Sequence, residues 1–166
     1  MTSDEALEKL LSAYEGYYTI KKENVTIPFT AEAEFHCHTE NYMLVKAAKI
    51  ADIDSNEYIY FSIQPQLNSL QLSELSLKAW NAGLEKVKPY NGHRNSDVTL
   101  IVIADRFDEN LKKTARKLHM SKNYNFGLYG WSNFRLAAID LSDGNSVSNF
   151  QGRDIKKLFS KTGLSS

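Results

Sequence analysis

Apolar and polar side chains alternate without interruption along residues 29–38, which is typical of a β-strand that packs one face on a core. Because successive side chains of a strand point to opposite faces, the two kinds separate completely. The apolar set, which we expect to face the core, is Phe29, Ala31, Ala33, Phe35 and Cys37. The polar set, which we expect to face away from the core, is Glu32, Glu34, His36 and His38.

The chain around this strand predicts one helix and several short strands. Leucines and Tyr14 repeat at helical spacing behind a candidate N-cap at Ser3, and Gly16 ends this helix. Short turns separate the expected strands, and strands joined by short turns pair in antiparallel fashion. We therefore predict an antiparallel meander. Its expected strands are residues 17–20, 25–38, 42–50 and 58–63.

The second half of the chain alternates helices with strands. We expect a helix from Asn68 or Ser69 to the residue before Pro89, since a residue that precedes proline resists helical geometry. Residues 98–104 are predominantly apolar, which is typical of a central strand covered on both faces. The remaining expected elements are a helix after Asp108, a hairpin of residues 126–131 and 134–141 around Ser132 and Asn133, a short strand near Val147, and a last helix at residues 154–160.

This order of elements predicts an α+β fold in a single domain of residues 1–166. We expect one mixed β-sheet, in which the N-terminal antiparallel meander is followed by helix, strand, helix, hairpin and helix. A chain of 166 residues suits one core of ordinary size. Its 42% hydrophobic and 24% charged residues are those of a globular protein.

Net charge and cysteine content narrow the classes of partner and location. The chain has 20 basic and 20 acidic residues, so no overall field attracts phosphates, and we expect no nucleic acid partner. Cys37 is the one cysteine, which excludes an intramolecular disulfide. No apolar run approaches the length of a membrane span, so we expect no membrane partner and predict a cytoplasmic location.

Two histidines suggest a metal site. His36 and His38 occupy alternate positions of one predicted strand, so both imidazoles can reach one cation. Glu34 precedes them on the same face as a third ligand, which would complete the zinc site of a metal-dependent hydrolase. The alternative is a polar strand face toward solvent, without metal or other cofactor. We favour the solvent face, because polar alternation is ordinary on half-buried strands.

Three further sets of residues are candidates for binding. Asp105 follows the central apolar run, where open α/β sheets bind ligands, or it makes a turn. Tyr129, Trp131 and Arg135 are candidates for lining a binding groove, and simple packing is the alternative. A run of bases predicts a solvated face on the helix after Asp108. These bases are Arg106, Lys112, Lys113, Arg116, Lys117 and Lys122.

Two resemblances to known protein families are present, of which the first covers most of the chain and the second concerns the order of the elements. The segment Phe126-Gly-Leu-Tyr-Gly-Trp131, followed by Phe134-Arg-Leu-Ala137, resembles a family of small archaeal and bacterial proteins of unknown function. The order of elements also resembles the core of restriction-endonuclease-like nucleases, which implies a carboxylate and a Glu-x-Lys pair that hold magnesium. The chain departs from that pair, because no lysine lies two residues after Glu32 or Glu34, and no glutamate precedes the lysines of residues 42–50 at that spacing.

These observations leave three hypotheses for function. The first is a cytoplasmic, non-enzymatic binding or protein-interaction domain. We expect it to form a homodimer through an edge strand or through a sheet face that bears Tyr42, Tyr58 and Tyr60. The second is a metal-dependent hydrolase that uses the zinc site described above, and the third is a degenerate nuclease-like domain. Whether the protein is an enzyme stays open.

Overall fold

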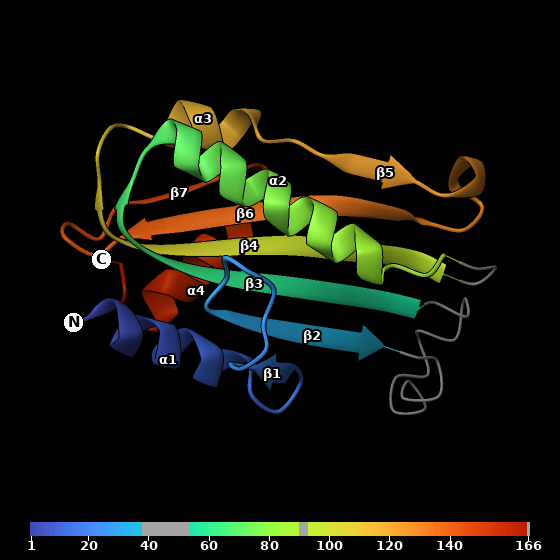
Figure 1. Ribbon diagram of the computed structural model, residues 1–166, viewed down its shortest axis with the longest axis horizontal. Coiled ribbons are helices and arrows are strands. Elements are labelled where there is room, and N and C mark those ends of the chain that lie inside the picture. The colour runs from blue at the N-terminus through green and yellow to red at the C-terminus, as the bar shows by residue number, and fades with distance from the viewer. Residues whose placement is uncertain (38–53, 90–92, 166) are drawn as a thin grey trace.

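A mixed β-sheet runs through the middle of the molecule, with helices on both of its faces (Figure 1). The computed structural model describes residues 1–37, 54–89 and 93–165. In these residues the sheet has seven strands in the order β1-β2-β3-β4-β6-β5, with β7 beside β6. The predicted α+β class with one mixed sheet is confirmed. The strands are β1 (Thr19–Lys21), β2 (Ala31–Cys37), β3 (Asp54–Leu67), β4 (His93–Phe107), β5 (Ser121–Asn123), β6 (Trp131–Asp140) and β7 (Ser146–Ser148).

The centre of the sheet is parallel and its edges are antiparallel. Neighbours β1, β2 and β3 pair in antiparallel fashion, as predicted for the meander, whereas the strand expected at residues 42–50 lies outside the described residues. β4 pairs in parallel with both β3 and β6. Every residue from Val98 to Ala104 is fully buried. The prediction that residues 98–104 form a central strand, paired on both edges, is confirmed.

The predicted hairpin around Ser132 and Asn133 is wrong. β6 runs straight through both residues, because Ser132 is buried and pairs with Ser96 of β4. The chain reverses earlier, in a loop where Gly127 and Gly130 have φ angles of 87° and 82°. Such angles suit glycine, which has no Cβ to clash with the backbone. β5 and β7 then pair in antiparallel fashion with the two ends of β6.

In the described part of the chain, four α-helices cover the sheet, two on each face. α2 and α3 pack on one face, and Figure 1 shows α2 crossing in front of the sheet. α1 and α4 pack on the other face. None of these helices combines the length and the apolar character that a membrane-spanning segment needs. Their bounds are α1 (Ser3–Tyr14), α2 (Ser69–Lys86), α3 (Lys112–Lys117) and α4 (Arg153–Lys161).

The sheet has a hydrophobic core on each face, and the face beneath α2 packs into one of them instead of facing solvent. Tyr58 and Tyr60 are buried in it, so the expected outward face of tyrosines is wrong, and Tyr42 lies outside the described residues. Alternation shows which side chains share a face but not what covers that face, and here the parallel crossover from β3 to β4 covers it with α2. Self-association stays a prediction, without the surface that was expected for it.

α3 and α4 both lie against β7, from opposite faces of the sheet. α3 begins at Lys112 and not directly after Asp108, and it contacts β7. Gly152 is the N-cap of α4, and a Cβ at this position would lie 2.2 Å from the carbonyl oxygen of Leu136 in β6. This close approach, which only glycine permits, places the first turn of α4 beside β6 and β7. The space along β7 is therefore bounded by two helices.

Candidate functional site

The polar row of β2 lies largely beneath α2. The predicted alternation is confirmed, since the alanines of β2 pack toward α1 while Glu32 and Glu34 point to the opposite face. Glu32 is only 3% exposed, however, because Lys86 of α2 reaches over it. The expected solvent face is therefore wrong for Glu32, whereas the side chain of His36 is 44% exposed.

The ends of this strand differ from the regular pattern. Phe29 is buried as predicted, but it packs on Tyr60 beneath α2, because it precedes β2 and takes no part in its alternation. Phe35 is half-buried. The side chain of Cys37 and all of His38 lie outside the described residues.

Lys86 and His36 each bind one carboxylate oxygen of Glu34. The Nζ atom of Lys86 lies 2.7 Å from Glu34 Oε1 and 3.4 Å from Glu32 Oε2. The ring atom Nε2 of His36 lies 3.1 Å from Glu34 Oε2, and its Nδ1 lies 3.0 Å from Asn56 Oδ1. Burial by itself raises the pKa of Glu34, but the hydrogen bonds from Lys86 and His36 outweigh it and lower the pKa. Glu34 is therefore held in its ionised form, and its charge is balanced by Lys86 within the fold.

This arrangement bears on the zinc and nuclease hypotheses. In the described part of the chain, no three His, Cys, Asp or Glu side chains are grouped so that they could hold a metal ion. A lysine does reach the two glutamates of β2, but it comes from α2 and not from a Glu-x-Lys pair. His38 lies outside the described residues, so the zinc alternative with Glu34, His36 and His38 stays a prediction.

The other predicted site residues are dispersed over the fold. Asp105 is exposed within β4 and does not make a turn. Tyr129 packs against the core beneath α2, whereas Arg135 lies on the opposite face, against α4. Trp131 begins β6, four residues before Arg135, which is roughly 13 Å along a strand. The structure therefore does not bring these side chains together into one groove.

Arg135 is held between two carboxylates. Its Nη1 donates to Glu57 at 2.5 Å, and its Nη2 donates to the two oxygens of Asp154 at 2.7 and 2.6 Å. Glu57 is buried and also accepts the hydroxyl groups of Thr99 and Tyr18. These hydrogen bonds connect β3, β4, β6 and α4. The guanidinium of Arg135 thus donates to groups of the protein itself. We conclude that Arg135 stabilises the packing of α4 on the sheet.

Asp97 lies at the edge of this cluster. It is half-buried, and its register partner in β3 is Glu57. Burial and, to a smaller extent, the charge of Glu57 raise the pKa of Asp97, and although Arg135 acts in the opposite direction, the net pKa is about 6. Two carboxylates thus lie side by side, and of the two only Glu57 forms an ion pair with a residue that the structure describes.

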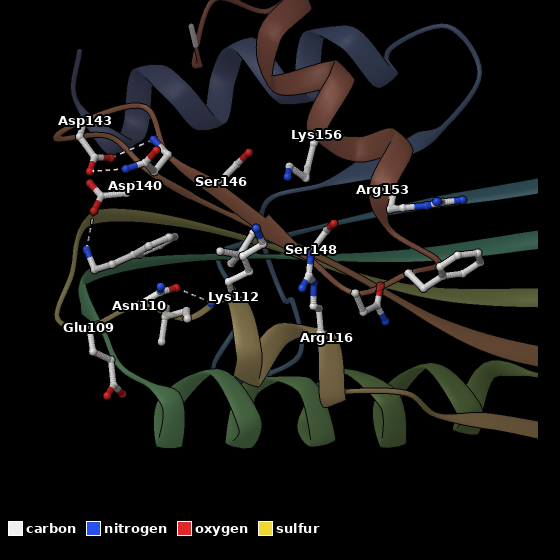
Figure 2. A pocket seen from close by; sticks show the side chains of 16 residues that line it. Glu109, Asn110, Lys112, Arg116, Asp140, Asp143, Ser146, Ser148, Arg153 and Lys156 are labelled. Carbon is white, nitrogen blue, oxygen red and sulfur yellow. Dashed lines mark hydrogen bonds between the residues drawn. The ribbon is translucent and has the colours of Figure 1, made fainter.

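A hollow of about 940 Å³ lies between α3 and α4, along β7 (Figure 2). We call it the α3–α4 groove. Figure 2 shows Lys112 and Arg116 projecting from α3, with Lys156 and Arg153 coming from α4. Asp140, Asp143 and Glu109 lie toward one end, and the four bases lie in the middle and toward the other. The lining is Phe107, Glu109, Asn110, Leu111, Lys112, Arg116, Asp140, Asp143, Asn145, Ser146, Val147, Ser148, Asn149, Phe150, Arg153 and Lys156.

The acidic residues of the groove are engaged by backbone amides. Asp140 accepts the N–H groups of Phe107 and Ser142, at 2.8 Å each. Burial raises the pKa of Asp140, but these bonds and the hydroxyl of Ser142 outweigh burial and lower it. Asp143 and Glu109 each accept one backbone N–H at 2.8 Å. None of the four bases forms an ion pair with a residue that the structure describes. The groove therefore presents unpaired positive charge.

The outer edge of β7 faces the same space. The backbone N–H of Asn149 donates to the carbonyl of Leu136 in β6, and the backbone N–H of Asp140 donates to the carbonyl of Asn145. The odd-numbered residues of the segment 145–149 therefore direct their backbone groups toward β6. In an antiparallel ladder the residues between them direct N–H and C=O away from the partner. β7 pairs only with β6 among the described strands. The backbone groups of Ser146 and Ser148 therefore face outward, toward the groove that both residues line.

The sequence contains a partial signal for this groove. Lys112 and Arg116 belong to the run of bases for which a solvated helix face was expected, and Arg153 and Lys156 recur at helical spacing opposite the buried Ile155. Each helix alone is an ordinary amphipathic surface. Only the placement of β7 between the two helices turns them into the walls of one site.

Comparisons with known proteins give a family but no activity. No curated protein and no solved structure matches the chain. One family model does, over residues 2–161, which is nearly the whole chain. This agrees with the resemblance to a family of unknown function that the segment Phe126-Gly-Leu-Tyr-Gly-Trp131 indicated. The chain belongs to the family described as Domain of unknown function (DUF8052).

Proposed function

We propose that this protein is a binding domain whose α3–α4 groove takes a phosphate-bearing ligand. The observation that carries the proposal is the set of four bases, from two helices, that line one hollow without an ion pair among the described residues. Unpaired cations that converge on a concave surface are the usual means of binding an anion. Arginine adds a planar pair of donors that matches phosphate oxygens.

The backbone of β7 supports an anionic ligand as well. The outward N–H groups of Ser146 and Ser148 are uncharged donors between the bases of α3 and those of α4. Phosphate oxygens accept hydrogen bonds from backbone amides and from cations alike. A phosphate in the middle of the groove therefore has donors on both sides and beneath it.

The carboxylates of the groove favour a binding role over a catalytic one. Asp140 accepts the backbone N–H groups of Phe107 and Ser142, which fixes the end of β4 and the loop after β6. An acid whose oxygens are used in this way is poorly placed to exchange a proton with a ligand. The proposal retains the sequence-based expectations of a cytoplasmic location and of self-association.

Calorimetric titration with inorganic tripolyphosphate at low ionic strength tests the proposal. Wild-type protein should bind it, and the double variant Lys112→Glu/Lys156→Glu should bind at least about a hundredfold more weakly. Each substitution removes a charged hydrogen bond worth about 1.5–3 kcal/mol, so the two together cost at least about 3 kcal/mol, and each 1.4 kcal/mol is a factor of ten.

The matched control changes the same charge on the same helices outside the groove. Lys113 of α3 and Lys161 of α4 are exposed and do not line it, so Lys113→Glu/Lys161→Glu should bind nearly as wild type does. Circular dichroism checks that both variants are folded. The proposal is overturned if wild type does not bind, or if the control loses as much affinity as the groove variant.

A further inference from the structure

Phe150 is a large aromatic side chain at the rim of the α3–α4 groove. It is 67% exposed, although Val147 and Asn149 just before it are buried. The ring also lines a second hollow, of about 640 Å³, on the side of α4 that faces Arg135. Phe150 and Arg153 are common to both hollows. The ring therefore stands where the two concave surfaces meet.

Arg153 covers one face of this ring. The guanidinium carbon Cζ of Arg153 lies 3.9 Å from the centroid of the Phe150 ring. Since the side chain stays 67% exposed with that face covered, its open surface is the opposite face and the ring edge. An aromatic ring backed by a guanidinium group is a flat platform on which a second planar ring can stack.

From this we infer that the ligand of the α3–α4 groove is a nucleotide, with its phosphates among the four bases and its nucleobase stacked on Phe150. The inference rests on the proposed function and names the class of ligand for the same site. It concerns a single nucleotide and not a nucleic acid strand, in keeping with the net charge of zero.

Two further features of the groove fit a nucleobase better than a phosphate chain alone. Beside the N–H donors, the outer edge of β7 offers the carbonyl acceptors of Ser146 and Ser148, which an ionised phosphate chain cannot use because it has no donor, whereas the amino group of a nucleobase donates to such an acceptor. The groove volume of about 940 Å³ lies near the upper end of the range of pockets that enclose a drug-sized ligand.

Comparison of adenosine triphosphate with inorganic tripolyphosphate tests the inference, because the two share a phosphate chain and differ in the nucleoside. Calorimetry with wild-type protein should show that adenosine triphosphate binds roughly five- to a hundredfold more tightly, the range that stacking on an aromatic ring provides. Phe150→Ala should remove this advantage and leave the affinity for tripolyphosphate unchanged. Phe126→Ala, a change of another exposed phenylalanine outside both hollows, should alter neither affinity.

The possible failures separate the inference from the proposed function. The nucleotide inference is overturned, and the proposed phosphate site is unaffected, if wild type binds the two ligands equally. The same holds if the tighter binding of adenosine triphosphate persists in Phe150→Ala. A loss of both ligands in Phe150→Ala also overturns it, because the ring then acts on the phosphate site and not on the base. Binding of neither ligand by wild type overturns both.

Discussion

Replacing Asp97 with asparagine should stabilise the fold at neutral pH. Asp97 of β4 and Glu57 of β3 are register partners, so two carboxylates lie side by side on the sheet face that packs against α1 and α4. Glu57 has the ion pair with Arg135. Like charges on neighbouring strands destabilise a sheet, and asparagine removes one of them with almost no change of shape.

The expected gain follows from the pKa of Asp97. Burial and the charges of Glu57 and Asp154 raise it from 3.8 to about 6, against the opposing effect of Arg135 and of a hydrogen bond with Asn95. That rise corresponds to about 3 kcal/mol between the two protonation states. Partial exposure to solvent screens the charge, so we expect about 1–2 kcal/mol for the variant at pH 7.5.

The gain in stability should depend on pH, in a direction that follows from the raised pKa of Asp97. The folded protein binds the proton of Asp97 more tightly than the unfolded chain does, so the wild type loses stability as the pH rises from about 4 to about 6. Asp97→Asn does not titrate at this position. Its advantage should therefore be full above about pH 7 and should shrink as the pH falls through 6.

Urea denaturation of both proteins between pH 8 and pH 4.5 measures the effect. Asp105→Asn is the matched control, because Asp105 lies on the same strand and the same face but is exposed, and its free energy of unfolding should change by less than about 0.5 kcal/mol. Destabilisation by Asp97→Asn at pH 7.5, or a gain that does not vary with pH, would refute the reasoning.

Two further predictions concern packing and metal. A Cβ at Gly83 of α2 would lie 2.4 Å from Cγ2 of Val98, so Gly83→Ala should cost about 1–3 kcal/mol by overpacking, despite the higher helix propensity of alanine, and adding Val98→Ala should recover part of the loss. A stabilised single variant in thermal unfolding would contradict this. We also predict that His36 and His38 do not hold a catalytic metal, so zinc titration of tag-free protein should match that of His36→Ala/His38→Ala. Stoichiometric submicromolar binding that the double variant loses would favour the hydrolase hypothesis instead.

Local patterns in the sequence were enough for the elements that depend on their own residues. The apolar run of residues 98–104 predicted the central strand, and the cap at Asn68 predicted the start of α2. The period of two in residues 31–36 placed the alanines of β2 on one face and Glu32 and Glu34 on the other. Each of these results follows from backbone geometry and side-chain spacing within a few residues.

Local patterns failed where a distant segment decided the outcome. Ser132 and Asn133 have turn propensity, yet Ser132 lies in β6, where its hydroxyl bonds Tyr124 and its backbone pairs with β4. Tyr58 and Glu32 were expected to face outward, yet α2 covers both. Turn propensity and alternation are weak preferences, and pairing or burial against another element outweighs them.

The candidate site is the clearest case of what the tertiary structure decided. In the sequence, the bases near Lys112 and those near Lys156 are the solvated faces of two separate helices, and Lys112 and Lys156 themselves are 44 positions apart (156 − 112). The fold places those helices on opposite faces of the sheet and β7 between them, so that their charges meet along one strand edge. Helical spacing fixes which side chains share a helix face, but the convergence of two faces depends on the strand order and on the close approach of Gly152 to β6, which only the packed sheet determines.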